Sequence, residues 1–153
     1  MRKLYSSFVA ILFALFAMVS FTACSSDDDG PSSEEIKEKI VGMWQVTHIS
    51  GWGYGGDDLI KVDDDFSEED SDRILFNEDG TCKRYWYYNG WRPYSSSYSY
   101  MVSDNKIIIH DNDYIEDTYT YTVISIKNNT AVLEVTLEEG PQYKQRITCK
   151  RVG

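Results

Sequence analysis

The sequence is poor in basic residues and in histidine. Its 153 residues include 15 Lys and Arg against 25 Asp and Glu, for a formal net charge of −10 at pH 7. Nucleic acids and anionic lipid surfaces repel such a chain, so neither is an expected partner. His48 and His110 are the two histidines, and neither has a Cys or Glu beside it at a metal-ligand spacing. We therefore expect no metal site and no cofactor.

Motifs for common catalytic and calcium sites are also missing. The serines at 95–97 lack a Gly-x-Ser-x-Gly context, which a hydrolase nucleophile of that kind needs. The acidic stretch between Asp57 and Asp72 has neither the glycine nor the final glutamate of an EF-hand loop. We interpret it as a solvent-exposed loop and expect no catalytic residues and no enzymatic activity.

The apolar run from Phe8 to Val19 is too short to cross a membrane, because a transmembrane helix needs roughly 20 such residues. The run follows Arg2 and Lys3 and precedes Thr22-Ala23-Cys24, which is the order of a signal peptide with a cleavage point. This segment resembles the lipobox of bacterial lipoproteins. We predict a signal peptide over residues 1–23 and acylation of Cys24 by palmitate-like chains, which anchors the protein in the membrane. An ordinary secretory signal with a free Cys24 thiol is the alternative.

Residues 24–33 are expected to form a flexible acidic tether, because Ser, Asp, Gly30 and Pro31 cannot bury apolar area. The Ser-Ser-Asp-Asp-Asp run after Cys24 resembles the tether of surface lipoproteins from the Bacteroides group. That resemblance implies an outer-membrane location with display at the cell surface, with a periplasm-facing domain as the alternative. Cleavage leaves 13 basic residues against 25 acidic ones, a net charge of −12.

Residues 34–153 form one predicted domain. A short helix is expected from Ser33 to Lys39, because Ser32 and Glu35 fit a capping box and Ile36 and Ile40 share a face. After it, short alternating segments separated by turn residues predict an all-β fold. Eight antiparallel strands are expected at 41–50, 73–77, 81–88, 94–102, 106–110, 118–127, 131–138 and 143–152.

The mostly short connections between these strands predict an up-and-down barrel, which leaves no exposed sheet edges. A Gly-rich acidic loop is expected over 51–72. The apolar phase shifts from Tyr121 and Val123 to Ile124 and Ile126, which predicts a β-bulge near Val123. His48 has the parity of Trp44, so we expect it to point inward.

Three short motifs carry a family resemblance: Gly42-Met43-Trp44, the segment from Ile74 to Thr81, and Cys149-Lys150-Arg151-Val152. Together they resemble the lipocalin-like domains of small Bacteroides-type outer-membrane lipoproteins, over about residues 36–153. The resemblance implies an eight-stranded lipocalin-like barrel that holds a small apolar molecule. It also implies that Arg151 lies across the Trp44 ring as a structural contact that closes one end of the barrel.

Aromatic residues are the best candidates for a ligand site. Flat rings stack on sugars and apolar molecules, and the polar edges of Tyr and Trp accept or donate hydrogen bonds. The candidates on inward positions are Trp86, Tyr88, Tyr98, Tyr100, Tyr119 and Tyr121. Arg84 and Tyr143 are candidates for a polar contact there. The alternative is that these rings fill the core and form cross-strand pairs.

We therefore expect a lipid-anchored lipoprotein of the cell envelope that binds a small apolar molecule or a glycan without catalysis. The alternative is a structural or interaction module of the outer-membrane surface, with another envelope protein as its partner. Cys82 and Cys149 either form a disulfide or remain as buried thiols.

Overall fold

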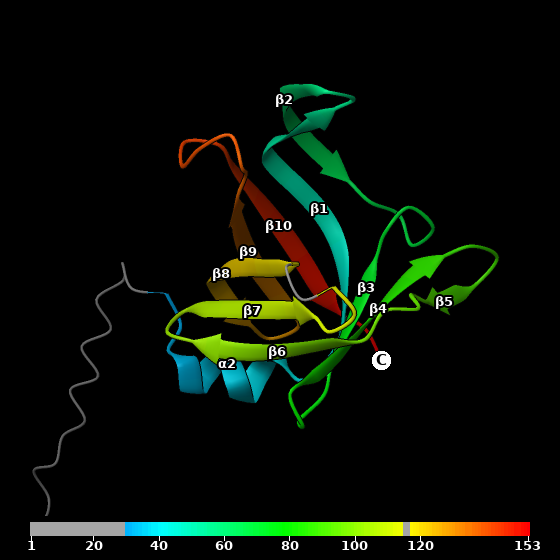
Figure 1. The fold of residues 1–153 in the computed structure, drawn as a ribbon, viewed down its shortest axis with the longest axis vertical. Helices are drawn as coiled ribbons and strands as arrows, with labels where there is room; N and C mark the ends of the chain where they lie inside the picture. Colours follow the sequence, from blue (N-terminus) through cyan, green and yellow to red (C-terminus); the bar gives the residue numbers. More distant parts are fainter. Residues whose placement is uncertain (1–29, 115–116) are drawn as a thin grey trace, which may run out of the picture.

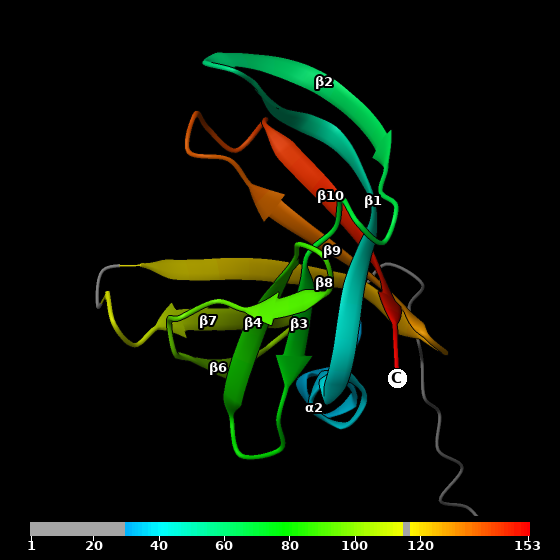
Figure 2. The same ribbon diagram turned by 90° about the vertical axis from the view of Figure 1, so that its right-hand side faces the viewer.

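The sheet closes on itself as a ring of eight antiparallel strands (Figures 1 and 2). The computed structural model describes residues 30–114 and 117–153, so the predicted signal peptide, Cys24 and the tether as far as residue 29 lie outside the described residues. The order around the ring is β1, β3, β4, β6, β7, β8, β9 and β10, and β10 pairs with β1 to close it. The predicted fold class is confirmed.

All eight predicted strands are present in this ring. Their bounds are Gly42–Gly55 for β1, Arg73–Phe76 for β3, Thr81–Tyr87 for β4, Tyr98–Ser103 for β6, Lys106–Asp111 for β7, Thr118–Lys127 for β8, Thr130–Thr136 for β9 and Lys144–Arg151 for β10. Two further strands lie outside the ring: β2 (Asp58–Asp65) pairs with β1, and the short β5 (Trp91–Pro93) pairs with β4.

The loop expected over 51–72 was a wrong prediction for most of its length. β1 continues to Gly55, and β2 runs back along it from the Gly55–Asp58 pair to the His48–Asp65 pair. This hairpin extends away from the ring (Figure 1). Its backbone pairing needs no buried face, and Ile60 is 43% exposed. The apolar alternation that reveals a half-buried strand is therefore weak here.

The inward orientation expected for His48 is also wrong. The register between β1 and β10 shifts between Val46 and His48, so His48 pairs with Thr148 while Val46 pairs with Cys149. Since paired residues share a face of the sheet and neighbours alternate, this bulge turns His48 to the outer face. There its ring nitrogens lie 2.9 Å from a carboxylate oxygen of Asp65 and 3.2 Å from one of Asp63.

The helix α2 (Ser33–Ile40) covers one end of the barrel (Figure 2). The hydroxyl of Ser32 accepts a hydrogen bond from the Glu35 amide at 3.3 Å, as the capping box predicts. Ile36 and Ile40 are buried. The indole N–H of Trp44 donates to the Ile40 carbonyl at 2.6 Å, so the first strand of the ring is tied directly to the end of the helix.

Arg151 completes this end of the barrel. Its guanidinium lies 4.7 Å from the centroid of the Trp44 ring and donates to the carbonyls of Lys39 and Val41. The expected contact with Trp44 is present. Gly42 has a φ of +126°, and a Cβ there would lie 2.6 Å from Nη1 of Arg151. The close approach of Arg151 therefore explains the glycine of the Gly-x-Trp motif.

The bulge predicted in β8 is confirmed by the register shift between Val123 and Ser125. Val123 and Ile126 are buried, whereas Ile124 is 39% exposed. Ile124 is thus the extra residue of the bulge. Of the two isoleucines that follow Val123, only Ile126 points into the barrel.

Replacing Arg151 with methionine should lower the free energy of unfolding by about 2–4 kcal/mol. The change removes the cation–π contact and leaves the two helix-end carbonyls without their donor. Denaturant unfolding followed by Trp fluorescence measures the effect. The control is Arg146→Met, which breaks an exposed ion pair with Glu134 and should cost less than about 1 kcal/mol. Equal losses in the two variants would contradict the assigned role of Arg151.

Candidate functional site

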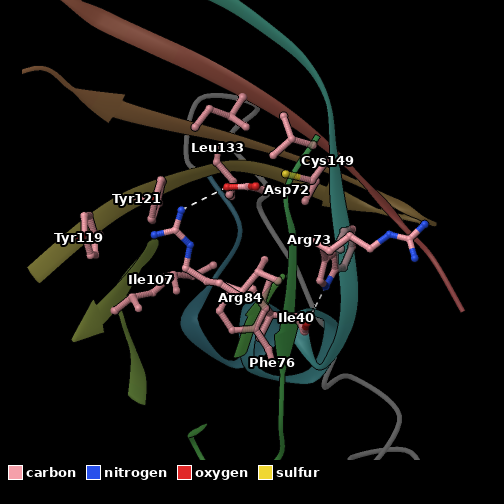
Figure 3. A pocket seen from close by; sticks show the side chains of 16 residues that line it. Ile40, Asp72, Arg73, Phe76, Arg84, Ile107, Tyr119, Tyr121, Leu133 and Cys149 are labelled. Atoms are coloured by element: carbon pink, nitrogen blue, oxygen red, sulfur yellow. Dashed lines mark hydrogen bonds and ion pairs between the residues drawn. The ribbon is translucent and has the colours of Figure 1, made fainter. Parts of the chain in front are cut away.

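A cavity of about 200 Å³ lies inside the barrel, bounded by side chains from α2 and most of the ring strands. Figure 3 shows these side chains converging on one space. One water molecule occupies about 30 Å³ in the liquid, so the cavity has room for about six or seven groups of the size of a water molecule. The interior therefore accommodates a small molecule in addition to its own side chains.

Most of the cavity wall is apolar. The inner face of each strand contributes its inward residues at a two-residue spacing. This wall includes Ile107, Ile109, Ala131, Leu133, Ile147 and Cys149. Trp44 and Phe76 bound the cavity at the end covered by α2. Such a wall favours an apolar occupant, because moving each CH₂ group of a ligand from water into the cavity contributes about 0.8 kcal/mol to the free energy of binding.

The polar part of the cavity is formed by Arg84 and Asp72. Arg84 follows Cys82 on the inner face of β4, and its guanidinium donates to an Asp72 carboxylate oxygen at 3.3 Å. The Tyr94 and Tyr98 ring centroids lie 5.1 and 6.0 Å from the guanidinium carbon. In Figure 3 the guanidinium points between Tyr121 and Asp72. A fixed positive charge is thus held at the edge of an apolar space.

The surroundings keep Arg84 charged and Tyr121 protonated. Burial alone lowers the pKa of Arg84, but Tyr121 and Asp72, with smaller effects from Tyr98 and Tyr94, outweigh it and the net shift is upward. Burial is the main cause that raises the pKa of Tyr121, opposed by the neighbouring Arg84 charge. At neutral pH Tyr121 therefore presents a hydroxyl that donates a hydrogen bond.

Arg73 also borders the cavity, but its charged group is engaged elsewhere. Its guanidinium lies 3.9 Å from the Trp91 ring centroid, donates to Gln45 at 3.0 Å and pairs with Glu68. Figure 3 shows this group pointing away from Arg84. Arg84 is therefore the guanidinium available to an occupant of the cavity.

A groove between β8 and β9 adjoins the cavity. The ladder between these strands extends only as far as the Thr122–Glu134 pair, so residues 118–121 pair with β7 alone. The groove is bordered by residues 118–122 of one strand and 134–138 of the other, with Tyr54 and Lys106. Tyr119 and Tyr121 line both the groove and the cavity. The divergence of the two strands therefore gives a route into the barrel.

Comparison with known families agrees with this arrangement. A lipocalin-like domain model matches residues 40–133, from the end of α2 to the middle of β9. The chain belongs to the lipocalin-like family.

Other comparisons add little to the family match. A biogenic amine-binding protein, solved as its selenomethionine derivative, is similar at 17% identity and a TM-score of 0.38. The similarity covers 73% of this chain and 63% of that protein. No curated protein sequence matches the chain.

The predicted aromatic site residues fall into three groups in this lipocalin-like barrel. Tyr119 and Tyr121 line the cavity. Tyr98 is buried, and Tyr100 packs edge-to-face on Phe76, so these two rings belong to the core.

Trp86 and Tyr88 lie outside the lining of the lipocalin-like barrel. They stack on each other at 5.9 Å and are 39% and 60% exposed. Trp86 shares the face of β4 that carries Arg84, two residues farther along the strand. The divergence of β4 from β6 explains this position, because the two strands pair only at Thr81–Ser99 and Cys82–Tyr98.

The polar candidates also separate. Arg84 is in the cavity, whereas Tyr143 packs edge-to-face on Trp52, with 5.0 Å between the ring centroids. Asp72 was missed as a cavity residue, because it ends the acidic stretch that the sequence analysis interpreted as a solvent-exposed loop. Its position depends on the pairing of β3 with β4, which sets Ile74 opposite Arg84 and so brings Asp72, two residues before Ile74, diagonally within reach of the guanidinium. Across residues 30–114 and 117–153, no cluster of three His, Cys, Asp or Glu side chains suits a metal ion.

Cys82 and Cys149 are both buried free thiols, so the open question of a disulfide is decided. Burial raises the pKa of Cys82 to about 11 and that of Cys149 to about 12. Neither thiol is a thiolate at neutral pH, which removes the reactive form needed for nucleophilic attack.

Both thiols should react slowly with Ellman's reagent at about pH 8 in the folded protein, since burial and a raised pKa each oppose thiolate attack. A Cys24→Ser chain isolates Cys82 and Cys149. Both should react fully after unfolding in denaturant. Rapid reaction in the folded state, or the absence of reactive thiol after unfolding without reductant, would contradict this assignment.

Proposed function

We propose that this protein is a lipid-anchored lipoprotein of the cell envelope whose barrel binds a small, largely apolar molecule without catalysis. The observation that carries the proposal is the cavity of about 200 Å³, with an apolar wall and one polar corner. Pockets for small molecules have this composition, in which a few polar groups fix the orientation of the ligand.

Binding without chemistry is supported by the groups that line the cavity. Cys149 is the thiol in the wall, and burial holds its pKa near 12. Asp72 is engaged by Arg84 and, at 3.4–3.5 Å, by the hydroxyl of Tyr94. No histidine lines the cavity in the described part of the chain, so the lining offers no nucleophile beside a general base.

The anchor rests on the sequence around Cys24. The leader ends in Thr22-Ala23-Cys24, and an acidic tether follows. Acylation would hold the domain at the outer membrane, with the tether separating it from the lipid surface. Within residues 30–114 and 117–153, no helix has the length and apolar composition needed to span a bilayer. The resemblance of this tether to those of surface lipoproteins from the Bacteroides group favours display at the cell surface. Protease accessibility on intact cells would distinguish this from a periplasmic position.

Filling the cavity should weaken the binding of a neutral apolar probe. Ala131 is 1% exposed and lies in the wall, so Ala131→Leu projects a larger side chain into the space. We expect about tenfold weaker binding of 1-heptanol by calorimetry, the equivalent of about 1.4 kcal/mol of lost contact. Ile124→Ala, on the outer side of the β8 bulge, is the control and should bind as the wild type does. No binding of 1-heptanol or similar apolar probes to the wild type would refute the proposal.

Cys24→Ala should abolish incorporation of labelled palmitate and release the protein from the membrane fraction, because the thiol is the acceptor of the lipid. Metabolic labelling followed by fractionation in the native host measures both effects. Cys82→Ala, in the barrel core, is the control for loss of a cysteine elsewhere. Continued labelling of the Cys24→Ala chain would exclude this residue as the anchor.

A further inference from the structure

The guanidinium of Arg84 has more donors than the protein supplies acceptors. An arginine has five N–H donors in one plane. Among the described residues, the contact at 3.3 Å with Asp72 is the hydrogen bond its side chain makes. That contact involves one nitrogen and is longer than a typical charge-assisted hydrogen bond. The Arg84 side chain is 33% exposed, and no buried side-chain nitrogen or oxygen among the described residues lacks a partner, so its remaining N–H groups are accessible to solvent or to a ligand.

Arg84 lines the cavity, and the groups around it leave most of its N–H donors without a protein partner. The Tyr94 and Tyr98 rings lie 5.1 and 6.0 Å from its central carbon, and Asp72 occupies one side. Tyr121 lies beyond the other side (Figure 3), and its hydroxyl stays protonated. An edge of two parallel N–H groups beside an O–H donor matches the two oxygens of a carboxylate.

We propose that the ligand carries a carboxylate that binds Arg84 and Tyr121, with an apolar tail of about six carbons in the cavity. This inference rests on the proposed function and specifies its ligand class. The tail would contact the wall formed by Ile107, Leu133 and Ile147. The carboxylate would replace Asp72 as the main partner of Arg84. Asp72, 43% exposed at the edge of the cavity, would turn to water.

An amine is the competing ligand class, since Asp72 offers a negative charge. The position of Asp72 disfavours it. Its carboxylate already accepts from Arg84 and from the Tyr94 hydroxyl, and an ammonium group beside it would lie close to the Arg84 cation. Repulsion between like charges is strong where water is partly excluded. A carboxylate on the Tyr121 side of Arg84 avoids the corresponding repulsion, because the guanidinium separates it from Asp72.

The test compares three ligands with the same tail: heptanoate, 1-heptanol and heptylamine. Calorimetric titration uses the whole mature chain from Cys24 to Gly153, with Cys24→Ser to prevent acylation. We expect heptanoate to bind at least about tenfold more tightly than 1-heptanol, because hydrogen bonds to a charged group contribute about 1.5–3 kcal/mol. Heptylamine should bind more weakly than either.

Three variants identify the residues responsible through the ratio of heptanoate affinity to heptanol affinity. Arg84→Met should lower this ratio about tenfold or more, and Tyr121→Phe about threefold or more, since each loses donors to the carboxylate. Asp72→Asn should raise the ratio, because it removes the carboxylate that competes for Arg84. Arg92→Gln is the matched control. Arg92 lies on β5, outside the cavity, and its guanidinium carbon is 5.8 Å from the centroid of the Tyr88 ring. The ratio should not change in this variant.

The outcomes distinguish failure of the proposed binding function from failure of the inference that the ligand carries a carboxylate. If neither heptanoate nor 1-heptanol binds, the proposed function fails. If both bind equally, or if heptylamine binds most tightly and Asp72→Asn abolishes this, the carboxylate inference fails while the binding function stands. Should Arg84→Met fail to fold, Asp72→Asn and Tyr121→Phe still decide: an unchanged ratio in both would overturn the assignment.

Discussion

The pairing of β1 with β10 is the interaction on which the rest of the molecule depends. It joins the first and last strands of the ring in the register Trp44–Arg151 and Val46–Cys149. Without this pairing the sheet would have two open edges. The same register brings the Arg151 guanidinium over Trp44 and onto the end of α2. Closure of the ring and closure of one end of the barrel are therefore consequences of a single strand pairing.

The other parts of the barrel are less completely paired, and this asymmetry creates the site. β8 and β9 are joined only from Thr122–Glu134 onward, and β4 and β6 share only two residue pairs. The first divergence exposes Tyr119 and Tyr121 to a groove. The second carries Trp86 past the rim of the cavity. An eight-stranded barrel has room for its own side chains or for one small ligand, and the incomplete pairing of β8 with β9 provides access to that space.

Local patterns in the sequence predicted the elements of the ring well. Two-residue alternation located all eight strands, the Ser32 cap located the helix, and the change of phase after Val123 located a bulge. Each of these features depends on residues within one turn or one strand. The prediction failed where the local pattern was weak. β2 has no buried residue. In β1 the parity of Trp44 was extended to His48, although the apolar phase shifts from Val46 to Ile49 at the bulge.

The sequence by itself determined the strand segments, the inward faces of most of them, the acidic charge and the anchor motif around Cys24. Only the tertiary structure decided which side chains meet. Asp72 and Arg84 come together because β3 and β4 pair. Tyr119 and Tyr121 line a cavity because β8 has left β9 where they stand, whereas Tyr98 is buried at a point where β6 still pairs with both β4 and β7. Periodicity is a property of one strand, but a cavity depends on the register and divergence of several, and short-range sequence patterns do not encode that information.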